Sequence, residues 1–173
     1  KNEVEKIVSV REDITDQINF EIQLKKNSSW QKAVLDGSDF SIIATDEHGI
    51  IQSFNKGAEK ILGMKANDMI GKQTPAIIHD FNEIIAHNHK ISSELNIPIE
   101  PGFRTFVTKA EVSGIDTNEW TYITKDKKRI PVKLSVTVLR DHNQRIFGYL
   151  GIAEDLSHQK SFELKWQQLL NLV

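Results

Sequence analysis

Cysteine is absent from the sequence, which has 173 residues. Without a thiol the chain can form no disulfide, perform no thiolate chemistry and bind no metal through cysteine. A chain without cysteine also suits a reducing compartment, so we expect a cytoplasmic location.

Long apolar runs and an excess of one charge are missing as well. No stretch approaches the roughly 18 apolar residues that a membrane-spanning helix needs, and the first residues lack a signal-peptide pattern. The 22 basic and 24 acidic residues are interspersed, so no basic patch stands out that would attract nucleic acid or an anionic membrane. We therefore expect no nucleic-acid partner and no membrane contact by this segment.

Proline and glycine are missing from residues 16–35, where apolar side chains recur among charged ones at helical spacing. Turn-forming residues at 36–39 end this stretch. The pattern predicts a helical linker over residues 16–37.

A hairpin and a short helix are expected next. Residues 40–45 and 50–55 have strand-like composition and flank a tight turn at 46–49. The helix over residues 56–62 should end at Gly63, because a left-handed residue is usual at that position.

The middle of the chain has the spacing of helices. Apolar residues predict a helix over residues 80–95 and a second one over 103–110. The polar residues 113–118 are expected to form a loop.

The last third has the pattern of β-strands. Residues 119–124 are rich in aromatic and β-branched side chains, residues 130–138 alternate apolar with polar ones, and residues 145–153 follow another turn. Two strands, a helical middle and three strands predict an α+β fold, with one antiparallel sheet covered by helices on one face.

A short motif occurs near both ends of the chain. Residues 12–17 resemble residues 154–159, and the same offset aligns Phe20 with Phe162. A repeat of domain length that is present only at the two edges suggests one complete module behind the end of a similar one. We therefore interpret residues 1–15 as the end of a preceding module of the same kind.

Both copies of this motif predict a strand followed by a helix. Residues 7–10 have a β-type composition, as residues 149–152 do in the second copy. Thr15 and Ser157 are residue types that commonly cap a helix, so each is expected to mark a helix start.

Three signatures in this order resemble a PAS domain, the sensor module of bacterial signalling proteins. Residues 45–63 resemble its opening hairpin and first helix, residues 120–132 its next hairpin, and residues 148–157 its last strand with an exit motif of the Asp-Ile-Thr type. The resemblance implies five antiparallel strands in the order 2-1-5-4-3, with the PAS domain over residues 38–157. Residues 158–173 would then begin a C-terminal signalling helix, so amphipathic helices would flank the domain on both sides.

Two details refine this resemblance. Residues 74–80 and 98–103 are similar to a subgroup of PAS domains found in histidine kinases and diguanylate cyclases. Lys127 or Lys128 stands where the family more often has glycine, which predicts a less tight hairpin turn.

The resemblance also implies a pocket between the sheet and the helices, which could hold a small organic ligand. The absence of cysteine excludes covalent flavin photochemistry and a thioester-linked chromophore. Six residues are candidates for the lining of this pocket. Five of them are apolar and lie in core-type sequence contexts, and one is a histidine: Phe54, Ile61, His79, Ile85, Phe103 and Trp120.

Haem is an alternative to an organic ligand, because the chain contains histidines that could bind its iron. An axial ligand could come from His79, His87 or His89, although the last two point about 200° apart on a helix and at most one can face the pocket. The apolar lining residues can fill the space themselves, so we predict no bound cofactor.

The function expected from these features is sensory rather than catalytic. No nucleophile, base and orienting group fall together, and no metal-ligand set is apparent, so we predict no catalytic residue, no metal site and no enzyme activity. The module would pass a ligand or packing signal through its flanking helices to an effector in the same chain, such as a histidine kinase or a diguanylate cyclase. Glu154, Asp155 and Ser157 are the predicted relay residues, because they join the last strand to the last helix.

Self-association is expected through the flanking helices. An apolar stripe at spacings of four, three and four would form the contact of a coiled-coil homodimer: Phe162, Trp166, Leu169 and Val173. The alternative function is a ligand-free domain that serves only for constitutive dimerisation and spacing.

Overall fold

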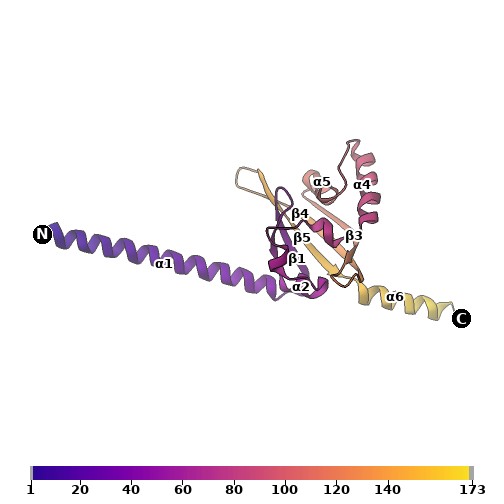
Figure 1. Ribbon diagram of the computed structural model, residues 1–173, viewed down its shortest axis with the longest axis horizontal. Helices are drawn as coiled ribbons and strands as arrows, with labels where there is room; N and C mark the ends of the chain where they lie inside the picture. Colours follow the sequence, from indigo (N-terminus) through magenta and orange to yellow (C-terminus); the bar gives the residue numbers. More distant parts are fainter. Residues whose placement is uncertain (1, 172–173) are drawn as a thin grey trace. The chain divides into compact units, whose positions relative to one another are not determined.

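The computed structural model describes residues 2–171, with side chains described from Ile14 to Asn171 (Figure 1). The chain divides into two compact units, Lys1–Gly37 and Ser38–Val173. Each unit is described by itself.

The first unit is one helix, α1 (Asn2–Asp36). The predicted strand at residues 7–10 is therefore wrong, and Thr15 lies inside a helix rather than at its start. An isolated strand would leave its backbone N–H and C=O groups without partners, whereas a helix free of proline and glycine pairs them internally. The origin of residues 1–15 in a preceding repeat stays a prediction.

The second unit is built on one antiparallel sheet of five strands. These strands are β1 (Ser41–Asp46), β2 (Ile51–Phe54), β3 (Ile115–Ile123), β4 (Arg129–Arg140) and β5 (Ile146–Asp155), and their spatial order is β2-β1-β5-β4-β3. The α+β fold and the strand order 2-1-5-4-3 that the resemblance implied are confirmed.

One boundary differs from the prediction. The expected polar loop at 113–118 is wrong, because β3 already begins at Ile115 and pairs with β4 along its whole length. The hydroxyls of Thr117 and Ser135 lie opposite each other at 2.8 Å, so polar side chains support the ladder here.

The hairpin between β3 and β4 closes without glycine. Lys127 adopts the left-handed conformation with φ of 63°, in the region where glycine is usual. The Lys127 N–H donates to the Thr124 carbonyl at 2.9 Å, and the Thr124 N–H donates to the Lys128 carbonyl at 2.9 Å. Lys127 thus adopts the left-handed backbone conformation itself, at a place where glycine would adopt it with less strain.

Short helices connect β2 to β3 and cover the inner face of the sheet. They are α2 (Lys56–Leu62), α3 (Ala66–Met69), the 3-10 turn η1 (Pro75–Ile78), α4 (Phe81–Leu95) and α5 (Phe103–Ser113). Figure 1 shows α4 and α5 beside the sheet, and α6 (Ser157–Leu170) continuing from β5.

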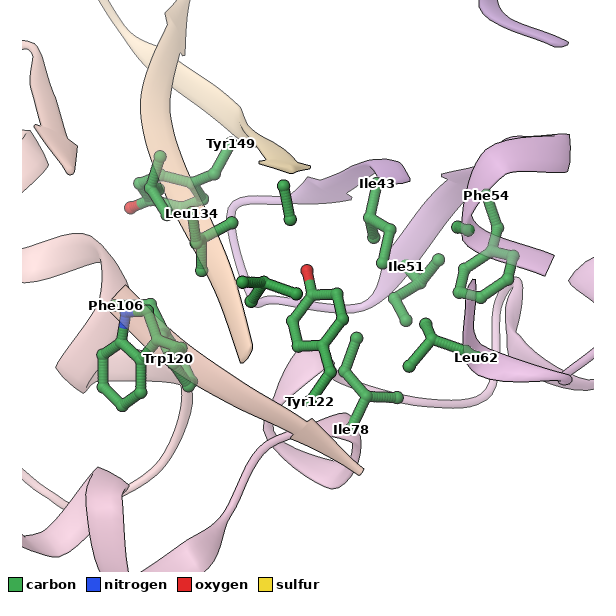
Figure 2. Packing of buried hydrophobic residues seen from close by; sticks show 14 of the residues in the cluster. Ile43, Ile51, Phe54, Leu62, Ile78, Phe106, Trp120, Tyr122, Leu134 and Tyr149 are labelled. Atoms are coloured by element: carbon green, nitrogen blue, oxygen red, sulfur yellow. The ribbon is translucent and has the colours of Figure 1, made fainter. Parts of the chain in front are cut away.

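The hydrophobic core lies between the sheet and these helices. Figure 2 shows Tyr122 in the middle of the cluster, with Phe106 and Trp120 together on one side. Side chains that are almost completely buried come from both layers: Ile51, Leu62, Ile78, Ile84, Val107, Tyr122 and Val132.

Asn55 joins the first hairpin to the first helix. Its buried Oδ1 accepts the N–H of Ala58 and the N–H of Ile42, both at 2.9 Å, and its Nδ2 donates to the Phe40 carbonyl at 3.0 Å. One side chain therefore caps α2 and also satisfies backbone groups at the start of β1.

We expect Asn55→Ala to destabilise the protein by about 3 kcal/mol, because it removes a helix cap and leaves buried backbone groups without partners. Urea unfolding of the two proteins measures the difference. Asn82→Ala, at the exposed start of α4, is the matched control and should change stability by less than about 0.5 kcal/mol. Equal losses in the two variants would contradict the assigned role of Asn55.

Candidate ligand cavity and sheet-to-helix joint

A cavity of about 30 Å³ lies on the inner face of the sheet. Its wall is mostly apolar, with side chains from β1, β4 and α5. The apolar part includes Ile43, Phe106, Val107, Leu134 and Val136, and the polar part includes Thr45, His79, Tyr122 and Tyr149.

The backbone holds His79 against the edge of β3. His79 forms an antiparallel bridge with Tyr122, and the N–H of Asp80 donates to the Thr121 carbonyl at 3.1 Å. The Glu83 carboxylate accepts the N–H of Thr121 at 2.7 Å and its hydroxyl at 2.6 Å. The segment that carries His79 is thus fastened to one strand by backbone and side chain together.

Asp80 starts the next helix at this point. Its Oδ1 accepts the N–H groups of Asn82 and Glu83, and its Oδ2 pairs with Arg129 of β4. Hydrogen bonding from Arg129 and from the helix start holds the pKa of Asp80 below its usual range. The carboxylate therefore fixes where α4 begins relative to the sheet.

His79 itself is buried, with 5% of its surface exposed. Its Nδ1 lies 2.8 Å from the Pro75 carbonyl oxygen, while its Nε2 has no partner among the described residues. Aromatic rings surround the imidazole, with centroid distances of 4.3 Å to Phe106, 4.9 Å to Tyr122 and 5.5 Å to Trp120. Burial lowers the pKa of His79 to about 4, so the ring is neutral near pH 7.

The two tyrosines of the wall are less acidic than usual. Burial raises the pKa of Tyr122 to about 12. Burial, followed by its hydrogen bond to Glu111, raises the pKa of Tyr149 to about 12. Arg104 forms two hydrogen bonds with the same carboxylate, at 2.7 and 2.8 Å, so Tyr149 connects the cavity to an ion pair on α5.

Phe103 lies where the wall meets solvent. It is the first residue of α5, it is half-buried, and its ring packs edge-on against Tyr149 with a centroid distance of 5.4 Å. The same ring packs on Gly49 in the turn between β1 and β2, where an added Cβ would come within 2.5 Å of it. The position of the ring therefore depends on the turn.

The structure brings together two of the six residues predicted to line the pocket. His79 and Phe103 lie on the cavity wall. Phe54 and Trp120 are buried in the core but do not line the cavity, and Ile61 packs against the core from outside.

The sixth residue, Ile85, is only half-buried, whereas its neighbour Ile84 is buried in the core. Consecutive residues of a helix point about 100° apart. An error in predicting which face of the helix is buried can therefore assign the buried position to Ile85 instead of Ile84. Tyr122 and Tyr149 were missed as wall residues, although strand alternation puts each on the inner face of the sheet.

The other two candidate histidines lie outside the cavity wall. His87 stacks on Trp120 with a centroid distance of 4.1 Å, and His89 is exposed. A cavity of about 30 Å³ has room for one or two water molecules. Haem does not fit this packing, and our expectation that no haem binds stays a prediction.

The joint between the sheet and α6 is formed by three consecutive residues. Leu156 is buried and its N–H donates to the Pro131 carbonyl at 2.8 Å, while Oδ1 of Asp155 accepts the N–H of Ser157 at 2.8 Å. Ser157 is the first helical residue and not the cap, because the position before it belongs to Leu156. The carboxylate of Asp155 takes the role that was expected of the Ser157 hydroxyl.

An ion pair that sequence analysis missed fastens α6 to the sheet. Lys160, in the first turn of α6, contacts the carboxylate of Glu119 on β3, and this hydrogen bond raises the pKa of the lysine. Strand register places Lys133 of β4 between Glu119 and the predicted relay residue Glu154 of β5. Alternating charges therefore cross three strands beside the start of α6.

No group of three or more His, Cys, Asp or Glu side chains among residues 14–171 is arranged to hold a metal ion. None of the helices in this part of the chain combines the length and apolar character needed to cross a membrane.

Comparison with known proteins gives one family and many similar folds. Residues 38–158 match the family model described as "PAS domain". The PAS domain of a protein from Colwellia psychrerythraea is 24% identical with a TM-score of 0.58, over 78% of this chain and 98% of that chain. The PAS domain of an HTR-like protein from Haloarcula marismortui is 16% identical with a TM-score of 0.54, over 79% and 98%.

A PAS domain from a two-component sensor histidine kinase is 8% identical with a TM-score of 0.54, over 76% of this chain and 97% of that chain. At these identities the structural likeness shows the fold alone. No curated protein matches the sequence.

The buried His79 should make stability depend on pH. Its folded pKa of about 4 lies below the ordinary value of 6.5, so the unfolded chain takes up the proton first as the pH falls. We expect the free energy of unfolding to fall by about 2 kcal/mol from pH 7 to pH 5 through this group. Urea unfolding at both pH values should show a clearly smaller difference for His79→Phe. An equal difference in the variant and the parent would mean that another group titrates.

Proposed function

Because the chain belongs to the PAS domain family, we propose that it is the sensory module of a bacterial multidomain signal-transduction protein. PAS domains are typically signal-sensing rather than catalytic. In this proposal a change in the cavity moves the sheet, and the sheet moves α6, which leads to an effector such as a histidine kinase or a diguanylate cyclase.

The observation that carries this proposal is that β3 contacts the cavity residues with one face and α6 with the other. Trp120 and Tyr122 lie on the inner face around His79, while Glu119 lies on the outer face and pairs with Lys160 of α6. Neighbouring residues of a strand point to opposite faces. A displacement of β3 therefore reaches the cavity and the last helix together.

The joint at Asp155 and Leu156 supports the same route. Buried Leu156 fixes the chain to β4 through the Pro131 carbonyl, so α6 cannot rotate freely about the end of β5. In this proposal α6 has two positions relative to the sheet. A ligand or packing change can shift α6 from one position to the other only if its interaction free energy differs between the two positions. The geometry of the ion pair between Glu119 and Lys160 would differ between these two positions.

A second candidate function is constitutive dimerisation and spacing without sensing. The small volume of the cavity favours this alternative, because a core that is nearly filled leaves little room for a signal molecule. The exposed apolar side chains of α6 serve either function.

The relay predicts an energetic coupling between the cavity and α6. The measured quantity is the rate of amide hydrogen exchange in the first turn of α6. We expect the rate in the double variant His79→Gln/Lys160→Met to differ by at least about twofold from the rate that the two single variants predict if their effects are independent. Hydrogen exchange of the wild type, both single variants and the double variant measures this.

Lys165→Met is the matched control, since this exposed lysine of α6 forms no ion pair among the described residues. Its effect should add to that of His79→Gln. Additive behaviour in both cycles would remove the support for a relay through Glu119 and Lys160, and would favour the spacer function.

We also propose that the chain forms a homodimer through its flanking helices. Phe162, Trp166 and Leu169 are all more than half exposed on α6, and the first two rings pack edge-on at 5.9 Å. The fourth member of the predicted stripe, Val173, lies outside the described residues. An exposed apolar stripe of this kind is typical of a helix that packs against a partner.

Trp166→Lys should shift the protein from dimer to monomer at tens of micromolar, because it places a charge in the apolar contact. Sedimentation velocity measures the shift. Gln167→Lys, on the next position of the same helix, adds the same charge and should leave the dimer intact. A wild-type protein that sediments as a monomer at this concentration would contradict the proposal.

A further inference from the structure

We propose that the cavity binds a small uncharged molecule that donates one hydrogen bond, and that Nε2 of His79 accepts it. This inference rests on the proposed sensory function and names the chemistry of its ligand. The class of ligand is a hydroxyl group on a compact apolar body, such as a small alcohol or a phenol.

The hydrogen bond at the other ring nitrogen fixes the proton. The Pro75 carbonyl oxygen can only accept, so Nδ1 of His79, 2.8 Å away, carries the hydrogen of the neutral ring. Nε2 is then a bare lone pair. It is buried and has no partner among the described residues, although buried polar atoms normally have one.

Two of the other polar side chains of the wall are already engaged. The Thr45 hydroxyl donates to the Asp46 carbonyl at 2.9 Å, and the Tyr149 hydroxyl donates to Glu111. The Tyr122 hydroxyl can donate or accept a hydrogen bond, whereas Nε2 of the neutral His79 can only accept, so Nε2 is the wall atom that selects a hydrogen-bond donor.

The surroundings of Nε2 argue against a charged ligand. No charged side chain lines the cavity, and an unpaired ion in an apolar site carries a large desolvation penalty. A molecule with one donor and an apolar remainder matches the wall at both ends.

The volume limits the size of this ligand and indicates where the wall must yield. About 30 Å³ is smaller than an aromatic ring needs, since an apolar cavity of about 150 Å³ is one known to bind benzene. Phe103 is half-buried at the boundary with solvent, and it occupies the first position of a helix that follows a proline-glycine pair. Displacing this ring enlarges the cavity, because Phe103 is part of its wall.

Phenol and toluene are the matched probes, because they have similar shape and only phenol donates a hydrogen bond. Affinities are measured by titration calorimetry with the wild type and with Phe103→Ala, which enlarges the cavity. We expect both probes to bind Phe103→Ala. Adding His79→Phe should weaken phenol about tenfold and leave toluene within about threefold, because only phenol then buries an unpaired donor.

His87→Phe in the same Phe103→Ala background is the control, since His87 stacks on Trp120 outside the cavity wall. It should leave the affinities for both probes unchanged. If His79→Phe impairs folding, the ¹⁵N resonance of Nε2 in Phe103→Ala answers the same question. Phenol should shift this resonance upfield and toluene should not.

The outcomes separate this inference from the proposed function. Equal losses of phenol and toluene on His79→Phe, or an Nε2 resonance that phenol does not move, would overturn the acceptor role while leaving a ligand cavity in place. Failure of both probes to bind Phe103→Ala would overturn the cavity as a ligand site. The relay through α6 is judged independently by the coupling between His79 and Lys160.

Discussion

The attachment of residues 79–83 to the edge of β3 is the constraint on which the rest of the domain depends. A backbone bridge at His79, the backbone N–H of Asp80 and the carboxylate of Glu83 hold this segment to the strand. Because the same residues also start α4, the position of the imidazole and the direction of the helix are set together.

The sequence predicted much of this arrangement. Alternation over residues 130–138 and the turn chemistry at 46–49 are local signals, and the structure contains the strands that they indicate. His79 and Phe103 were placed near a pocket by resemblance and do lie on its wall. The contact between Lys160 and Glu119 could not be predicted, since 41 residues separate the two and each is an ordinary exposed charge until the register of the sheet is known. The same holds for residues 7–10, whose β-type composition could not override a helix that satisfies its own backbone.

The small cavity and the charged joint bear differently on the two candidate functions. A spacer needs a well-packed core and an attachment for its helices, and both are present. In the proposed sensor, the unpaired Nε2 of His79 would be the polar group that a ligand satisfies. A polar atom that is kept buried without a partner costs stability in the empty domain, so its presence favours a role that is completed by binding.

Gly49 has a consequence for access to the cavity. The ring of Phe103 packs directly on this glycine, and any larger residue would push the ring away. A single substitution in this turn would thus alter access to the interior while every residue of the cavity wall stays the same. Size and access of the cavity are therefore adjustable from a position that lies outside its wall.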